Sequence, residues 1–533
     1  MSRARPAIRA RLTARRLALA IFLIAAFLAI LALLGDSSHG APADNAARLV
    51  PADAVVYVHA NVDRDSDQWK RGTALLERFP ALRRLEARFL RGLTRRGGAL
   101  DLEQEVDPWL GNEAALALIP DRGGRARSLI LLEVSDRALA RSFLARAVGQ
   151  ERRSSYRGID VRAYGQLATA FMGPFLAIGQ PENVRASIDA WAGRARSLAH
   201  LATFVRARRG IPDRDRLLFA YASRTGLRRV LRPQPGLGGR LARLADDPDL
   251  AAVAAILSAQ KDGARIDLST ALEGSPSALA RARSAPFEPR LLRSVSEDAI
   301  AYVGMRGADR VLESLASFAG GAISLPSELR SARADLERFG GLRALRRLRP
   351  LLDEEAALFV SRSAAVPVIT LVVNGIDGKE ADELLNSLQP LLARLARRPP
   401  AGGQVPTLEP TRVGGIDAAS LRLSPSLELT YAIFGGKAVI TTSPGGILRV
   451  KLAKSHVLDN PLFAPGMRGD LDQVTSVLFL DLEQLLALGE QAGLGDSPDY
   501  QQLKTELSPV RAVSAITHAK TASKETEIFI EVP

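Results

Sequence analysis

Residues 17–34 form an unbroken run of apolar side chains, LALAIFLIAAFLAILALL, near the start of a 533-residue chain. At about 1.5 Å per residue, a helix of this length is about 27 Å long, close to the roughly 30 Å of bilayer hydrocarbon. Residues 1–16 hold six arginines and no acidic residue, and a polar segment follows the run. By the positive-inside rule, this asymmetry predicts one transmembrane helix preceded by a basic cytoplasmic tail.

The alternative to an uncleaved anchor is a secretory signal peptide cut after Ala41-Pro42-Ala43. Cleaved signals normally have an apolar region of about 7–15 residues, which is shorter than this run. We therefore favour a signal anchor at 17–34. No apolar run of comparable length follows, so we expect a single-pass cell-membrane protein with a soluble extracytoplasmic domain.

The composition argues against several kinds of chemistry. The chain has no cysteine, so it has no disulfide, thiolate nucleophile or cysteine-ligated metal. Its five histidines are scattered and do not form a His-Glu-x-x-His or similar pair, which argues against zinc. Neither a phosphate-binding loop nor a Gly-x-Ser-x-Gly elbow is present. We expect no cofactor, no metal and no enzymatic activity.

The order of features repeats along the chain. DAVVYVHA at 53–60 resembles DAIAYVGM at 298–305, and GIDVRAY at 158–164 resembles GIDAASL at 415–421. Further matches follow in the same order, which is typical of a duplicated domain. The alternative is that a general alternation of strands and helices produces such matches by chance.

The offsets between matched positions test the duplication. Asp136 and Asp377 are 241 residues apart, whereas Asp160 and Asp417 are 257 apart. The change falls at a Pro- and Gly-rich segment, 397–410, which we interpret as an insertion in a surface loop.

Short runs rich in β-branched and apolar residues, such as AVVYVHA and SLILLEV, predict strands. Apolar residues at three- and four-residue steps predict a helix within 71–93, and Asp136 is expected to cap another. Adjacent strands with short joins favour antiparallel pairing. The predicted fold class is α+β, with an N-terminal transmembrane helix and two tandem repeats of a mainly antiparallel sheet with packed helices. The predicted segments are a tail at 1–16, an anchor at 17–34, a linker at 35–48, a first repeat at 49–273, a linker at 274–294 and a second repeat at 295–533.

The opening of the predicted ectodomain, LVPADAVVYVHANVDRDSDQWKRGTALLERFP at 49–80, carries a family resemblance. A Pro-Ala-Asp turn, a strand containing Tyr57 and the sequence Gln68-Trp69-Lys70 before a helix are its most specific features. With the anchor and the repeated pattern, the chain resembles the bacterial DUF3352 family of uncharacterised proteins. The resemblance implies a membrane-anchored envelope protein and supplies no catalytic residues.

Two acids are the best candidates for a catalytic site. Asp160 and Asp417 recur as Gly-Ile-Asp in both halves, and a paired acid in a cleft can act as a general base. The structural alternative is that each aspartate closes a turn before a strand. Asp353-Glu354-Glu355 is expected to be a solvated turn, and the three tryptophans are expected to be core or half-buried anchors.

The favoured function is a non-enzymatic binding or structural module of the bacterial cell envelope. The alternative is a carrier or enzyme acting on a hydrophobic or anionic envelope molecule in a cleft of the ectodomain. The net charge of +14 favours anionic lipid or acidic polymer as partners, together with an envelope protein. Nucleic acid is not expected, because only 5% of residues are aromatic and the domain lies outside the cytoplasm.

Overall fold

The computed structural model describes these residues: 44–79, 105–121, 123–148, 152–212, 214–232, 245–246, 249–273, 286–306, 354–363, 367–375, 379, 408–424, 427–463, 471–491, 493–520 and 523–532. They divide into two compact units. Unit 1 comprises Met1–Ala280 with Lys520–Glu525 and Val532, and unit 2 comprises the rest of the chain. The predicted anchor at 17–34 lies outside the described residues. Within the described part of the chain, no helix combines the length and apolar character needed to cross a bilayer.

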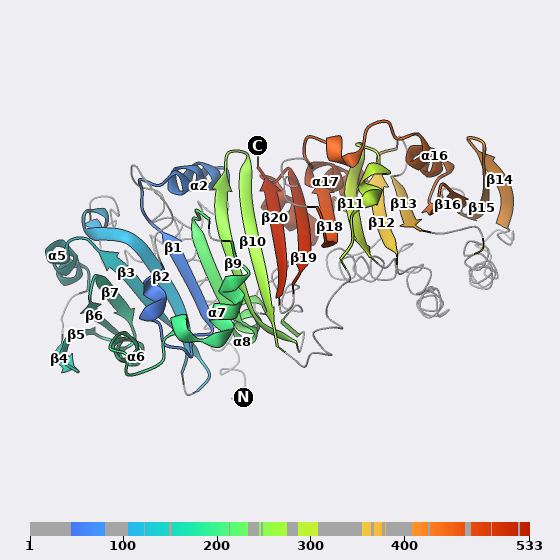
Figure 1. The fold of residues 1–533 in the computed structure, drawn as a ribbon. Coiled ribbons are helices and arrows are strands. Elements are labelled where there is room, and N and C mark those ends of the chain that lie inside the picture. The colour runs from blue at the N-terminus through green and yellow to red at the C-terminus, as the bar shows by residue number, and fades with distance from the viewer. Residues whose placement is uncertain are drawn as a thin grey trace, which may run out of the picture. The chain divides into compact units, whose positions relative to one another are not determined.

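Unit 1 is built on an antiparallel sheet. Its strands pair in the spatial order β10-β9-β8-β1-β2-β3-β7-β6-β5-β4 (Figure 1). The strands are β1 (Val56–Asn61), β2 (Leu110–Pro120), β3 (Ala126–Val134), β4 (Arg152–Tyr156), β5 (Ile159–Tyr164), β6 (Leu167–Met172), β7 (Phe175–Gly179), β8 (Leu218–Ser223), β9 (Leu250–Gln260) and β10 (Gly263–Leu272).

Helices cover both faces of this sheet. The helices are α2 (Asp67–Glu77), α5 (Arg137–Val148), α6 (Pro181–Trp191), α7 (Ala202–Arg209) and α8 (Arg224–Leu231), with 3-10 turns η1 (Ala46–Arg48), η2 (Asp107–Trp109) and η3 (Leu198–His200). One core contains Tyr57, Phe204 and Phe219 together with residues of α6, α7 and η1. The opposite core contains Trp69 and Trp109 with residues of α5. Because β2 lies between the two cores, its run AALALI is buried on both faces.

Unit 2 is also built on an antiparallel sheet. Its strands pair in the order β20-β19-β18-β11-β12-β13-β17-β16-β15-β14. The strands are β11 (Ala299–Arg306), β12 (Glu355–Ser361), β13 (Val368–Asn374), β14 (Leu408–Val413), β15 (Ile416–Ser424), β16 (Leu427–Phe434), β17 (Lys437–Thr441), β18 (Val474–Asp481), β19 (Ala512–Ala519) and β20 (Ser523–Glu531), of which Thr526–Glu531 belongs to this unit. The helices are α16 (Pro444–Leu452), α17 (Leu482–Gln491) and α18 (Pro498–Leu507), with 3-10 turns η5 (Arg290–Arg293) and η6 (Val457–Asp459).

The α+β class and the antiparallel pairing predicted from the sequence are confirmed. Asp136 caps α5 as expected, because its Oδ1 accepts hydrogen bonds from the amides of Ala138 at 2.8 Å and Leu139 at 3.0 Å. Only the part of the helical run 71–93 up to residue 79 is described, and it falls in and just after α2. Asp377 and most of the inserted segment 397–410 lie outside the described residues.

Candidate functional site

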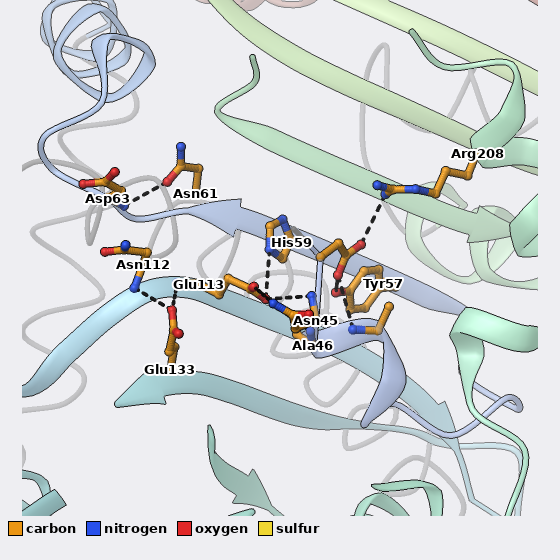
Figure 2. Close-up of polar contacts among 12 residues, drawn as sticks. Asn45, Ala46, Tyr57, His59, Asn61, Asp63, Asn112, Glu113, Glu133 and Arg208 are labelled. Atoms are coloured by element: carbon orange, nitrogen blue, oxygen red, sulfur yellow. Dashed lines mark hydrogen bonds and ion pairs between the residues drawn. The ribbon is translucent and has the colours of Figure 1, made fainter. Parts of the chain in front are cut away.

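A buried carboxylate, Glu113 of β2, holds the start of η1 against the sheet of unit 1. Its Oε2 accepts hydrogen bonds from the backbone amides of Asn45 (3.0 Å) and Ala46 (3.2 Å), and its Oε1 accepts one from Asn45 Nδ2 (2.7 Å) (Figure 2). His59 Nε2, on the neighbouring strand β1, lies 3.5 Å from Glu113 Oε2. The first amides of a helix have no partner within the helix. Glu113 therefore supplies the acceptors that η1 needs.

A second carboxylate, Asp44, connects η1 to α7. Tyr57 Oη donates a hydrogen bond to Asp44 Oδ1, and the Ala47 amide donates to the same oxygen at 3.2 Å. Arg208 Nη1 lies 3.4 Å from Asp44 Oδ2. Burial, and then the charge of Asp44, raises the pKa of the Tyr57 hydroxyl well above its ordinary value. Tyr57 therefore remains a hydrogen-bond donor at physiological pH.

These side chains also bring three metal-ligand groups together. One ligand atom each of Asp44, His59 and Glu113 lies within 4.8 Å of the others. The carboxylate oxygens, however, already accept hydrogen bonds from backbone amides, from Asn45, from Tyr57 and from Arg208. A cation would have to displace these donors. The geometry therefore favours an anchor for η1 over a metal site.

A hollow of about 470 Å³ opens beside this network, and we call it the Phe219 hollow. Its apolar floor includes Phe204, Phe219 and Ile256, which are all in the buried core. Four arginines also line it: Arg48, Arg208, Arg209 and Arg216. Asp44 is the one acidic residue among the described residues that line it.

Two of these arginines show how the hollow is built. The Arg208 guanidinium lies over the Phe219 ring, 5.2 Å from its centroid, and also faces Asp44. Arg216 lines the hollow although its residue is only 5% exposed. Burying a guanidinium is costly, and with four arginines against one acid the described lining of this hollow carries net positive charge.

A second hollow of unit 1, the Trp191 hollow, has a volume of about 790 Å³. Its walls include Met172, Phe175 and Trp191, and its arginines are Arg48, Arg194 and Arg196. Trp191 is 45% exposed, unlike Trp69 and Trp109, which are in the core. Arg48 of η1 lines this hollow as well as the Phe219 hollow.

Unit 2 has a hollow of different character beside α17. It has a volume of about 690 Å³ and is lined by Arg362 and Arg511 together with Asp481 and Glu483. Asp481 is already engaged, because its Oδ1 accepts a hydrogen bond from the Gln484 amide at 3.1 Å. With two arginines and two acids, this hollow shows no clear preference for one sign of charge.

Glu355 of unit 2 is buried, so the expectation of a solvated turn at 353–355 is wrong for this residue. It is the first residue of β12, and its Oε1 accepts a hydrogen bond from the Leu291 amide in η5 at 2.7 Å. Burial raises its pKa to about 7, although hydrogen bonds from the amides of Leu291 and Arg290 and from Asn374 lower it. Glu354 follows the expectation, because its side chain is 55% exposed.

Neither Asp160 nor Asp417 lies in the buried network. Asp160, in β5, has 55% of its side chain exposed and contacts Arg162 Nε at 3.1 Å. Asp417, in β15, is 86% exposed and contacts Arg412 Nη2 at 2.8 Å. The structure therefore places each aspartate beside an arginine, the partly buried Arg162 in one case and the exposed Arg412 in the other. The catalytic role suggested by their recurrence stays a prediction.

The residues that build the site were not singled out by the sequence. Asp44, Asn45 and Arg48 fall within 35–48, a segment for which the sequence predicts a linker. An Asp-Asn pair before Ala-Ala-Arg is a helix-start pattern that could have identified η1. The arginines could not be distinguished, because the chain is rich in arginine throughout.

The chain belongs to a family described as proteins of unknown function (DUF3352), which matches residues 16–506. This confirms the resemblance seen in the sequence. The family description gives no activity.

Among solved structures, crystal forms I and IV of TP0453 resemble the chain weakly. They are 14% and 13% identical to it, with TM-scores of 0.28 and 0.26, and each match covers 44% of this chain and 81% of TP0453. Likeness at this level supports no conclusion about fold or function. No curated protein matches the sequence.

Proposed function

We propose that this protein is a non-enzymatic binding module of the bacterial cell envelope, held at the membrane by the helix expected at 17–34. Its ligand is an anionic amphiphile that unit 1 binds in the Phe219 hollow. The observation that carries the proposal is the combination of a buried apolar floor and four arginines in one hollow.

The two parts of the hollow suit the two parts of an amphiphile. An apolar ligand chain that contacts Phe204, Phe219 and Ile256 loses its own exposure to water, which contributes about 25 cal/mol per Å² of ligand surface buried. Guanidinium groups pair with phosphate or carboxylate through charge-assisted hydrogen bonds. The volume of about 470 Å³ falls within the range of small-molecule sites.

The buried acids support binding over catalysis. The described residues that line the Phe219 and Trp191 hollows do not include Tyr57, His59 or Glu113. Glu113 accepts hydrogen bonds from the start of η1, and Tyr57 donates to Asp44. These groups fix the backbone that carries Arg48, and we assign them no role in proton transfer to a ligand.

We further propose that the two units are tandem repeats. The order of strand pairing from β14 to β19 in unit 2 follows that from β4 to β9 in unit 1. In each unit a buried glutamate near the start of the second strand accepts an amide hydrogen bond from a 3-10 turn, as Glu113 and Glu355 do.

Binding of dodecyl phosphate below its micelle concentration tests the ligand class, with calorimetry as the measurement. We expect tighter binding than for inorganic phosphate, which lacks the chain, or for dodecyl maltoside, which lacks the charge. Arg209→Gln should weaken binding of dodecyl phosphate by about two- to fivefold, because an exposed ion pair contributes up to about 1 kcal/mol.

The matched control is Arg152→Gln, which removes an exposed arginine from β4 of the same unit, away from the residues lining the hollow. Equal weakening by both variants would show general attraction to a basic protein. Equal affinity for dodecyl phosphate and dodecyl maltoside would contradict an anionic site.

The catalytic alternative is tested separately, with Asp160→Asn and Asp417→Asn. We expect both variants, and the double variant, to preserve the phenotype of the parent protein, because each carboxylate is largely exposed and paired with an arginine. The measurement is complementation of a deletion strain. Loss of complementation by variants that accumulate at parental levels would favour the enzyme alternative.

A further inference from the structure

Arg48 has an unusual position in unit 1, because it lines both the Phe219 hollow and the Trp191 hollow. It is exposed and belongs to η1, whose first amides are held by Glu113. Its backbone is therefore fixed in place between two concave surfaces. A negatively charged group that pairs with Arg48 has access to both hollows.

Each hollow combines apolar walls with further arginines. Phe204, Phe219 and Ile256 contribute to one, and Met172, Phe175 and the half-exposed Trp191 contribute to the other. Both volumes, about 470 and 790 Å³, are in the range of small-molecule sites. A ligand that fills both therefore needs two apolar parts joined near an anion.

The arginines that line the two hollows outnumber the acids, because the described lining of each hollow has one acid, Asp44 or Glu133. Asp44 pairs with Arg208. Asp44 accepts hydrogen bonds from Tyr57 and Ala47, and Glu133 accepts them from the amides of Asn112 (2.8 Å) and Glu113 (3.0 Å). Figure 2 shows the Glu133 carboxylate turned toward Asn112. Among the described residues, Arg48, Arg194 and Arg209 have no carboxylate within ion-pair distance.

We propose that the two hollows form one site for a two-chain anionic lipid. Its phosphate lies at Arg48, one acyl chain occupies the Phe219 hollow, and the other occupies the Trp191 hollow. The proposal rests on the proposed function, because the Phe219 hollow must first bind an anionic amphiphile. The two-chain proposal adds to that function the number of acyl chains in the ligand and a role for Trp191.

The test compares two probes in neutral mixed micelles with the detergent-extracted full chain. The probes are phosphatidic acid and lysophosphatidic acid, both with brominated acyl chains, which quench tryptophan fluorescence on contact. Trp191 is the exposed one of the three tryptophans in the chain, and Trp69 and Trp109 are buried. Quenching therefore reports on the Trp191 hollow.

We expect phosphatidic acid to quench Trp191 and to bind about tenfold or more tightly than lysophosphatidic acid, because a second chain buries additional CH₂ groups. Trp191→Phe should remove the quenching, which assigns the signal to this side chain. Arg194→Gln should weaken the binding of phosphatidic acid and leave the binding of lysophosphatidic acid unchanged, whereas Arg209→Gln should weaken the binding of both lipids. Arg152→Gln is the matched control and should change the binding of neither lipid.

The outcomes separate this inference from the proposed function. Equal affinity for the two lipids, or quenching by the one-chain lipid alone, would overturn the two-chain site and leave the Phe219 hollow as an amphiphile site. If Arg209→Gln lowers the affinity for neither lipid, both proposals are overturned.

Discussion

Single residues explain how the two units differ at equivalent positions. His59 lies opposite Ala115 in β2, two residues after Glu113, and Gly304 lies opposite Ala357 in β12, two residues after Glu355. Unit 1 therefore places an imidazole 3.5 Å from its buried carboxylate. Unit 2 has a glycine without a side chain at the matching position. Burial raises the pKa of Glu355 to about 7.

This raised pKa predicts how stability depends on pH. The folded protein holds a proton on Glu355 up to about pH 7, whereas the ordinary value is 4.5. The contribution of Glu355 to stability is therefore fully present below about pH 4.5 and is lost as the pH rises through about 7. From the difference in pKa, we expect a loss of up to about 3 kcal/mol.

Glu355→Gln should flatten this dependence, because the amide resembles the protonated acid and still offers an oxygen to the Leu291 amide. The measurement is urea unfolding followed by circular dichroism at pH 5 and pH 8. Glu354→Gln serves as the control, because its side chain is 55% exposed. A wild-type stability that does not change over this range would contradict the prediction.

Hairpin turns explain the recurring Gly-Ile-Asp at the level of elements. Tyr156 pairs with Ile159 across Arg157-Gly158, and Val413 pairs with Ile416 across Gly414-Gly415. Both residues of each turn have positive φ, which is typical of a type I′ turn. The glycine therefore completes the turn and the isoleucine begins the next strand. The aspartate is exposed because successive strand residues point to opposite faces of the sheet. Gly435-Gly436 forms the same kind of turn.

Gly415→Val should destabilise the β14–β15 hairpin more than Gly415→Asn does. The φ of +80° is unfavourable for a β-branched residue and tolerated by asparagine, and an added Cβ meets no neighbouring atom. The difference should be about 1 kcal/mol or more in the free energy of unfolding, measured by urea denaturation.

A matched control for the hairpin variants is Gly495→Val. This glycine also has open space around an added Cβ, but its φ lies outside the positive range. If valine costs as much at 495 as at 415, the backbone conformation is not the cause.

At the level of the whole molecule, strand register supports the duplication that remains a prediction. Asp160 and Asp417 occupy matching places in their hairpins. The residue after each aspartate pairs across the hairpin in the same way, Val161 with Ser154 and Ala418 with Thr411. The residue of unit 1 that corresponds to Phe479 is Tyr221. Tyr57 lies opposite Tyr221, and Tyr302 lies opposite Phe479, so the offset at this strand is 258.

The membrane topology gives a prediction for the whole chain. An alkaline phosphatase reporter fused after residue 43 should be active, because we expect residues beyond 35 to lie outside the cytoplasm. Deletion of 17–34 should abolish this activity and release the protein from the membrane fraction under carbonate extraction. An inactive fusion, or a full-length chain that carbonate extracts, would contradict the predicted anchor.

Local sequence patterns were enough to predict the fold class, because strand alternation, helix caps and turn glycines depend on residues close together in the chain. It also determined the family, through the motif that begins at 49. The order of the strands, and the meeting of Asp44, Glu113 and Arg208 from distant segments, were decided only by the tertiary structure. A charged residue looks the same in the sequence whether it faces water or caps a buried turn. Long-range packing alone makes Glu355 a buried cap and puts Arg48 between two hollows.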